Sequence, residues 1–427
     1  MDRSAGVGIN GVGIDLRCGA RVLGVLLLCL IGVSCGDEYR PVAVPIVPPQ
    51  PDPAALHFML VLSDNGPNDP GAGSELDVSG DTNIGVAQVG LSPSHATLIP
   101  NGARLYVTNS AEDSVSSYSP TSPGSVTTIS LPAGADPVFV HSTENNTVYV
   151  ANFGNKTVAA ISTATNVVLS PLIVVGTNPV ALAETPDQKK LYVANQGDGD
   201  VSSISLVDRS VVQTIPTGGT PVWTVARSDS ARVYVLNGGS GTVSAIDTAT
   251  DTLLSNVAVG AGANFMLYDG KLNRLYVTNP TANTLTALSV AADPPAVLFT
   301  LPVAASPVTV AALPDGTRAY VASVSSSGGT AISQVTVVNA SDGSVRTVIP
   351  LASVAASCAS ARFELFTAAS ADSSKVYVGN CDARNTSIIR TSDDTKVLDM
   401  AAPLSAVTPP NGGNPLPQNP VFVLAGP

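Results

Sequence analysis

Side chains with the potential for chemistry are sparse in this sequence. Of its 427 residues only three are histidines, and no two of these have the spacing of a metal-ligand pair. His141 ends a short apolar run, Pro137-Val-Phe-Val-His141. Its imidazole can face the interior of the fold as a site residue, or it can be solvated or hydrogen-bonded without a functional role. Trp223 is the only tryptophan, and it can either floor a binding pocket or fill a core.

Acidic residues suggest one further site, although a weak one. Asp198 and Asp200 alternate with glycine in Gly197-Asp-Gly-Asp200, and calcium takes oxygen ligands from such side chains. No bidentate Glu follows at the spacing of a calcium loop, so the sequence favours a hydrated acidic turn over a calcium site. Asp136, in the loop Ala133-Gly-Ala-Asp-Pro137, is a further candidate for a binding rim.

Motifs that would identify a reaction or a cofactor are absent from the sequence. It has neither the haem attachment string C-x-x-C-H nor a nucleophile elbow G-x-S-x-G in a strand–turn–helix setting. With 20 Lys+Arg against 32 Asp+Glu and a net charge of −12, it offers no basic cluster for phosphates. We therefore expect no nucleic-acid partner, and we assign no catalytic residue, metal or cofactor from sequence.

The elements that must position these residues repeat along the chain. Seven tyrosines, at positions 106, 149, 192, 234, 276, 320 and 377, share one short pattern in steps of 42–44 residues and one step of 57. The strings are Arg104-Leu-Tyr-Val-Thr-Asn109, Thr147-Val-Tyr-Val-Ala-Asn152, Lys190-Leu-Tyr-Val-Ala-Asn195, Arg232-Val-Tyr-Val-Leu-Asn237, Arg274-Leu-Tyr-Val-Thr-Asn279, Arg318-Ala-Tyr-Val-Ala-Ser323 and Lys375-Val-Tyr-Val-Gly-Asn380.

Each repeat unit reads as four short strands. In the third unit the strand-like runs are Val180–Ala183, Leu191–Ala194, Val201–Leu206 and Val211–Ile215, with turn-forming residues between them. Four antiparallel strands per 40–45 residues are typical of a β-propeller blade, whose strands A to D run from the axis outward. The fold class is therefore all-β, a propeller of four-stranded antiparallel blades.

The strings resemble the YVTN β-propeller repeat, over most of the chain after residue 55. The resemblance implies a radial propeller fold, which serves many different functions. Some similar propellers are lactonases that place acidic, Arg and His residues in the channel. We can assign no such set of residues in this sequence. We interpret the repeated Tyr as a filler between blades whose hydroxyl finds a polar partner. The Asn three residues later closes strand B, with a side chain that bonds nearby backbone and tolerates left-handed geometry.

The two chain ends predict an additional blade. Leu56–Leu62, Ser74–Val78 and Ile84–Val89 read as strands B, C and D, and Asn419-Pro-Val-Phe-Val-Leu424 repeats Asp136-Pro-Val-Phe-Val140 as strand A. We therefore predict eight blades with a terminal "velcro" closure in one propeller domain over residues 55–427; seven blades is the alternative.

The N-terminus carries the signals of export. Residues 1–35 combine an apolar run, Val22–Val33, with Ser34-Cys35-Gly36, which resembles a lipobox apart from Gly32 where Leu is usual. Cys35 is thus the candidate for lipidation, and an ordinary secretory signal is the alternative. Residues 36–54 are Pro-rich and suit a tether, so we expect an exported, membrane-anchored lipoprotein of the bacterial cell envelope.

Two cysteines remain for the domain. Cys358 and Cys381 form an even pair in an oxidising compartment, and the D-to-A and B-to-C loops that hold them lie on one face of a propeller. We predict a disulfide; two buried thiols are the alternative.

Short, small-residue loops on that face supply few groups for chemistry. We therefore expect a non-enzymatic scaffold that binds an envelope protein, a glycan or a small ligand at its rim or channel, through residues such as Trp223, His141, Asp136, Asp198 and Asp200. The membrane would be contacted only through the lipid. A lactonase-type hydrolase and a structural surface-layer component are the alternatives.

Overall fold

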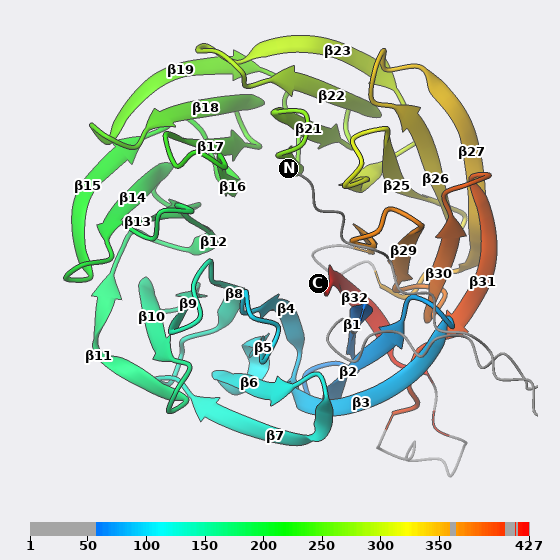
Figure 1. Ribbon diagram of the computed structural model, residues 1–427, viewed down its shortest axis with the longest axis horizontal. Helices are drawn as coiled ribbons and strands as arrows, with labels where there is room; N and C mark the ends of the chain where they lie inside the picture. The colour runs from blue at the N-terminus through cyan, green and yellow to red at the C-terminus, as the bar shows by residue number, and fades with distance from the viewer. Residues whose placement is uncertain (1–56, 359–363, 406–414, 416, 427) are drawn as a thin grey trace, which may run out of the picture. The chain divides into compact units, whose positions relative to one another are not determined.

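The β-branched runs of each repeat form strands, and residues with a left-handed backbone turn the chain between them. The structure, a computed structural model, describes residues 57–358, 364–405, 415 and 417–426. In these residues, Asn166 (φ 54°), Asp251 (φ 54°) and Gly241 (φ 64°) illustrate the turns. The strands form eight antiparallel sheets of four strands each, arranged radially as an eight-bladed β-propeller (Figure 1).

The first blade joins strands from both ends of the chain, and the others are continuous in sequence. Blade 1 contains β1 (Phe58–Asp64), β2 (Pro70–Asp77), β3 (Thr82–Leu91) and β32 (Asn419–Ala425). Blades 2 to 4 contain β4 (Pro93–Leu98), β5 (Leu105–Asn109), β6 (Ser114–Ser119), β7 (Ser122–Ser130); β8 (Pro137–His141), β9 (Thr147–Asn152), β10 (Thr157–Ser162), β11 (Val167–Val174); and β12 (Pro179–Glu184), β13 (Lys190–Asn195), β14 (Asp200–Ser205), β15 (Ser210–Pro216).

Blades 5 and 6 contain β16 (Pro221–Ala226), β17 (Arg232–Asn237), β18 (Thr242–Asp247), β19 (Thr252–Ala258); and β20 (Phe265–Asp269), β21 (Arg274–Asn279), β22 (Thr284–Ser289), β23 (Ala296–Pro302). Blades 7 and 8 contain β24 (Pro307–Ala312), β25 (Arg318–Ser327), β26 (Thr330–Asn339), β27 (Val345–Ala355); and β28 (Leu365–Ala369), β29 (Lys375–Asn380), β30 (Asn385–Arg390), β31 (Thr395–Ala401). One 3-10 turn, η1 (Ser110–Glu112), is the only helical element among the described residues.

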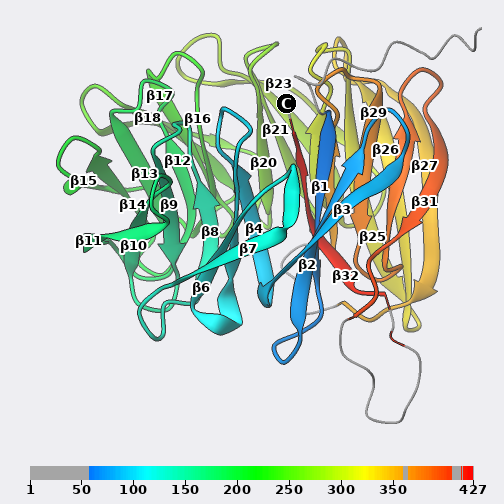
Figure 2. The ribbon, with the colours of Figure 1, turned by 60° about the horizontal axis from the view of Figure 1, so that its bottom comes forward.

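Ring closure follows the prediction from the chain ends. Strand β32 is the innermost strand of blade 1 and pairs antiparallel with β1, with Phe422 opposite Leu62 (Figure 2). The strands predicted near residues 56–62, 74–78 and 84–89 are β1, β2 and β3. The eight-bladed propeller with terminal closure is therefore confirmed, and the seven-bladed alternative is excluded.

Several of the repeated tyrosines link neighbouring blades through their hydroxyls, whereas the hydroxyl of Tyr276 has no hydrogen-bond partner among the described residues. The Tyr192 hydroxyl donates to Asp251 Oδ1 of the next blade at 2.6 Å, and Lys190 Nζ lies 2.6 Å from the other oxygen of this carboxylate. In the same way Tyr320 and Arg318 both contact Asp394, at 2.5 and 2.6 Å. A basic residue two places before the Tyr thus completes an inter-blade clamp on an Asp in the C-to-D turn. Tyr377 with Lys375 on Asp81 repeats the clamp, at 3.1 and 2.7 Å.

The Asn that ends strand B bonds side chains of strand C in some repeats and nearby backbone in others. Asn195 is buried, and its amide donates to Asp200 Oδ1 at 2.8 Å and to Ser202 Oγ at 2.9 Å on strand C. Asn109 is extended, with φ −116°, and the left-handed residues come later in the B-to-C turns, at positions such as Asn283. The Asn itself therefore has an extended backbone paired within the sheet, and at Asn279 and Asn380 the side chain also accepts a nearby backbone N–H, as predicted.

The clamp at Asp394 provides a stability prediction. Asp394 is 8% exposed and accepts from Tyr320, Arg318 and Arg346, so Asp394→Asn leaves a partly buried guanidinium without its counter-ion. We expect the free energy of unfolding to fall by about 2–4 kcal/mol. Asn also tolerates the left-handed backbone of this position (φ 55°), so the substitution adds no backbone strain to the change in the free energy of unfolding.

Urea denaturation measures the effect, and Asp393→Asn is the matched control. Asp393 is adjacent in sequence but forms an exposed ion pair with Arg390, so its replacement should leave the midpoint nearly unchanged. Equal midpoints for the two variants would contradict the clamp.

The insertion in the repeat lengthens blade 7 and leads to the disulfide. Strands β25, β26 and β27 have 10, 10 and 11 residues, and Cys358 follows them in the D-to-A loop. Cys358 is bonded to Cys381 of the next blade, with Cα atoms 5.9 Å apart. Asp382 Oδ1 accepts the backbone N–H groups of Ser357 and Cys358 at 2.6 and 2.9 Å.

The predicted signal, the tether and Cys35 lie outside the described residues. In the described part, no helix has the length and apolar character that spanning a bilayer requires.

Candidate functional site

One position on strand A forms a tier around the propeller axis. Strand pairing makes eight residues equivalent, six of which have aromatic or imidazole rings. They are His95, Phe139, Ala181, Trp223, Phe265, Thr309, Phe366 and Phe422. We call the six ring-bearing members the aromatic girdle.

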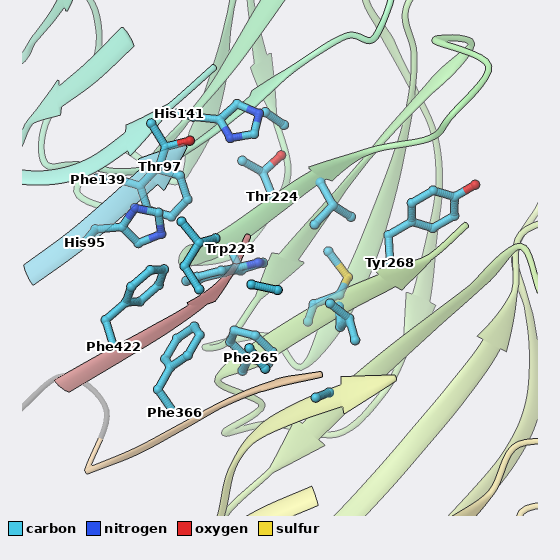
Figure 3. A pocket seen from close by; sticks show the side chains of 18 of the residues that line it. His95, Thr97, Phe139, His141, Trp223, Thr224, Phe265, Tyr268, Phe366 and Phe422 are labelled. Carbon is cyan, nitrogen blue, oxygen red and sulfur yellow. The ribbon is translucent and has the colours of Figure 1, made fainter. Parts of the chain in front are cut away.

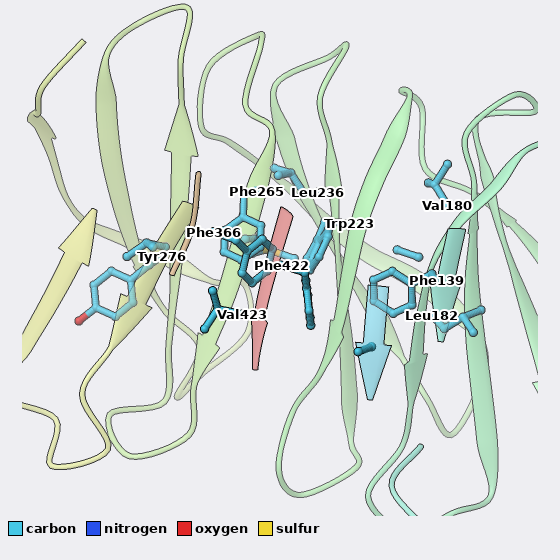
Figure 4. Close-up of a cluster of buried hydrophobic side chains, with 14 of the residues drawn as sticks. Phe139, Val180, Leu182, Trp223, Leu236, Phe265, Tyr276, Phe366, Phe422 and Val423 are labelled. Carbon is cyan, nitrogen blue, oxygen red and sulfur yellow. The ribbon is translucent and has the colours of Figure 1, made fainter. Parts of the chain in front are cut away.

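The girdle closes on itself. Its ring centroids lie 3.9 Å apart for His95–Phe139, 5.4 Å for Phe139–Trp223, 4.8 Å for Trp223–Phe265, 5.7 Å for Phe265–Phe366, 4.5 Å for Phe366–Phe422 and 4.4 Å for Phe422–His95. Phe139 reaches Trp223 past the small Ala181, and Phe265 reaches Phe366 past Thr309 (Figure 4). Aromatic pairs at these separations attract beyond their simple burial.

Cavities lie on both sides of the girdle. The larger, of about 570 Å³, is lined by the carboxyl-terminal halves of all eight A strands and has the girdle as its floor (Figure 3). The smaller, of about 440 Å³, is lined by residues that precede the girdle, including Val138 and Val222. The larger volume falls in the usual range of small-molecule sites.

Among the described residues, Glu184 is the only one with a carboxyl group in the lining of the larger cavity. It ends β12, at a position where the other blades have apolar residues, a Ser or a Tyr: Leu98, Ser142, Ala226, Tyr268, Ala312, Ala369 and Ala425. Its Oε2 accepts the Thr143 backbone N–H at 2.8 Å. Its Oε1 has no hydrogen-bond partner among the described residues, although the side chain is 1% exposed.

Burial sets the ionisation of this carboxyl. It raises the pKa of Glu184 to about 7, against the opposing hydrogen bond from Thr143, and the nearby charge of Glu144 contributes in the same upward direction. A carboxyl with a pKa near neutrality can take up and release a proton at physiological pH.

His141 lines the same cavity from the neighbouring blade. It ends β8, two residues before the Thr143 that contacts Glu184 (Figure 3). Burial lowers the pKa of His141 to about 4, so its imidazole is neutral at pH 7 and offers one N–H donor and one acceptor. The Thr224 hydroxyl, also in the lining, has no hydrogen-bond partner among the described residues. A carboxyl able to act as a base and uncommitted polar groups thus meet in an apolar cavity.

Two of the five candidate rim and channel residues come together here. Trp223 belongs to the girdle and His141 to the cavity above it. Asp136 lies at the opposite mouth, in the smaller cavity with Asn264. Its backbone N–H donates to Asp113 Oδ1 at 2.8 Å, and burial, followed by the charge of Asp113, raises the pKa of Asp136.

Asp198 lies in the B-to-C turn and Asp200 begins β14, and neither residue lines either cavity. Asp198 is exposed and accepts the Thr177 backbone N–H at 2.7 Å, a contact that lowers its pKa. Asp200 accepts the Asn195 amide at 2.8 Å. Among the described residues no three His, Cys, Asp or Glu side chains form a group that could hold a metal ion. Asp198 thus links the B-to-C turn to the preceding D-to-A loop, and Asp200 bonds its partner on the neighbouring strand.

Sequence reasoning missed Glu184, and a signal for it existed. Aligning the eight A strands by their Tyr partners would have shown a carboxylate where its equivalents are mostly Ala. The acidic candidates taken from sequence lie instead in loops at the other end of the A strands.

No protein-family model matches this sequence, and no curated protein matches it either. Solved structures do. A putative 6-phosphogluconolactonase from Bacteroides uniformis ATCC 8492 is 15% identical with a TM-score of 0.55, over 70% of this chain and 99% of that one. The Pseudomonas aeruginosa periplasmic gluconolactonase PpgL is 18% identical with a TM-score of 0.55, over 70% and 96%. The dihydro-heme d1 dehydrogenase NirN, in complex with DHE, is 9% identical with a TM-score of 0.65, over 86% and 75%.

These similarities establish the propeller fold, and they correct the expectation about function. The prediction of a non-enzymatic scaffold is contradicted, because the similar structures bear the names of enzymes, two of them lactonases. Of the alternatives drawn from sequence, the lactonase-type hydrolase is the one they favour.

Proposed function

We propose that this protein is a lactonase-type hydrolase whose reaction takes place in the larger channel cavity. The observation that carries the proposal is Glu184, a buried carboxyl in the lining of an apolar cavity of about 570 Å³, with a pKa of about 7 and one oxygen that has no hydrogen-bond partner among the described residues. Such a group is suited to general-base catalysis at neutral pH. The lactonases among the similar structures support the reaction class.

The chain's own residues account for each step of a hydrolysis. Glu184 Oε1 takes a proton from a water molecule, whose oxygen attacks the ring carbonyl carbon of the lactone. The ring C–O bond breaks, and Glu184 returns the proton that it took from water to the departing ring oxygen, which gives an open-chain hydroxy acid and restores the carboxylate. The Thr143 N–H holds Glu184 Oε2 at 2.8 Å, which leaves Oε1 as the proton acceptor, and the reaction requires that this buried oxygen become accessible to water.

Negative charge on the carbonyl oxygen needs hydrogen-bond donors. A neutral His141 N–H and the Thr224 hydroxyl line the cavity and supply them without a full positive charge. This set of residues differs from the set that the resemblance to propeller lactonases implies, which includes an Arg in the channel. Among the described residues that line the cavity, none is Arg.

A pH–rate profile tests the role of Glu184. The carboxylate is the active form, so kcat/KM should fall about tenfold per pH unit below a pKa of about 7 and level off above it. His141 titrates near pH 4 and adds no second limb between pH 5 and 9. The measurement is the initial rate of lactone opening, followed by proton release. A flat profile across that range would exclude Glu184 as the base.

The proposed location is the bacterial cell envelope, with export directed by residues 1–35 and lipid attached to Cys35. The lipobox-like string supports export, as does the similarity to a gluconolactonase named as periplasmic, and the YVTN-like repeats fit a family of exported propellers. Labelling of cells with a fatty-acid probe should mark the wild-type protein and miss Cys35→Ser. An unlabelled wild type would contradict the anchor.

A further inference from the structure

We propose that the substrate is a lactone bearing an aliphatic chain, and that the chain lies against the aromatic girdle while the ring lies at Glu184. This rests on the proposed function, because it names the substrate class of the same cavity. Recognition of an aliphatic lactone requires an apolar surface. Recognition of a sugar lactone requires polar contacts to its hydroxyl groups and to any phosphate it bears.

The charge of the cavity argues against a phosphorylated substrate. Among the described residues that line it, none is Lys or Arg, and the one carboxyl, that of Glu184, would repel a phosphate when ionised. A phosphate ester carries two negative charges and needs cationic partners, commonly Arg.

The composition of the lining argues against a ligand rich in hydroxyls. The walls include part-exposed side chains such as Val225, Leu267, Ala368 and Leu424, and the girdle forms the floor. Each sugar hydroxyl placed against these side chains would lose its water without gaining a partner, which is costly. An aliphatic chain buries its methylenes there favourably.

The placement of the polar groups fixes the orientation. Glu184 lies three residues along strand A from the girdle tier, and three residues of strand span about 10 Å. Thr143 and Glu184 therefore define a polar end near the mouth, and the girdle an apolar end about 10 Å deeper. A bare lactone ring held at Glu184 leaves the deep end unfilled, whereas an attached chain fills it.

Binding of a chain-length series tests the inference. Trp223 is the only tryptophan and lies in the girdle, so its fluorescence reports on the cavity floor. Binding to the Glu184→Gln protein is measured for γ-butyrolactone, γ-hexalactone, γ-octalactone and γ-decalactone. We expect Kd to fall about fourfold for each added methylene until the cavity is full. D-Glucono-δ-lactone should bind no better than γ-butyrolactone.

A pair of variants locates the chain. Ala368 lines the larger cavity at the tier of His141, so Ala368→Leu should weaken γ-decalactone at least tenfold and leave γ-butyrolactone unchanged. Val138→Leu narrows the opposite cavity and is the matched control, with no expected effect on either ligand.

Turnover of the same series by the wild-type protein separates this inference from the proposed function. Hydrolysis of glucono-δ-lactone with no gain from chain length would overturn the substrate class and leave the hydrolase intact. Chain-dependent binding without turnover of any lactone would overturn the hydrolase and leave the apolar ligand site. If the protein neither binds nor hydrolyses any lactone of the series, both the proposed function and the substrate class are overturned.

Discussion

Glu184→Gln is expected to lower kcat/KM for lactone opening by a factor of about 10²–10⁴, the usual contribution of a positioned general base. The amide keeps the size of the side chain and can still accept the Thr143 N–H, but it cannot take a proton from water. KM should change little, because the substrate's contacts with the cavity walls are unaltered. Initial rates at pH 8, with the carboxyl ionised in the wild type, measure the loss.

Glu144→Gln is the matched control for this variant. Glu144 is the neighbouring acid whose charge raises the pKa of Glu184, yet it does not line the cavity. Its replacement should keep the plateau rate and move the pH–rate limb to slightly lower pH. Full activity in Glu184→Gln would remove the carboxyl from the mechanism, even if Glu144→Gln behaves as expected.

Truncation after Gln418 is expected to abolish the folded monomer. It removes β32, which supplies the inner strand of blade 1 and places Phe422 and Val423, 4% and 1% exposed, in the core. Loss of Phe422 alone would cost about 3–5 kcal/mol, a large part of the stability of an ordinary domain. The truncation also opens the girdle and exposes the pairing edge of β1.

Circular dichroism and gel filtration measure the outcome. We expect loss of the cooperative thermal transition and formation of aggregates, whereas Phe422→Ala in the full chain should remain folded with a lower midpoint. A synthetic peptide of residues 415–427 added during refolding should restore the monomer, since β32 completes its blade from a distant part of the chain. A truncated protein with the wild-type transition would show that β32 does not close the ring.

The fold was predictable because its determinants are local and repeated. The Tyr192 string recurs at a nearly constant step, and the likeness between Pro420-Val-Phe422 and Pro137-Val-Phe139 revealed the closing strand. Only one partner of the clamp could be predicted from the sequence, namely the Tyr. Its Asp partner lies in the next blade, 59 residues away in the case of Tyr192 and Asp251.

The site was harder to predict because it depends on what eight separate strands bring to one axis. Trp223 and His141 were identified as channel candidates, but the girdle requires His95 and four Phe residues from other blades. The properties of Glu184 arise from burial among apolar neighbours, which no local pattern shows. Asp198 and Asp200 form a local acidic cluster in the sequence, but each bonds a neighbouring loop or strand and neither lines a cavity.

A crystal structure of the Glu184→Gln protein soaked with γ-decalactone tests the central claim most directly. We predict the ligand in the larger cavity, with its carbonyl carbon near residue 184 and its chain against Trp223 and Phe265. A ligand bound instead in the smaller cavity, beside Asp136 and Asn264, would contradict the claim.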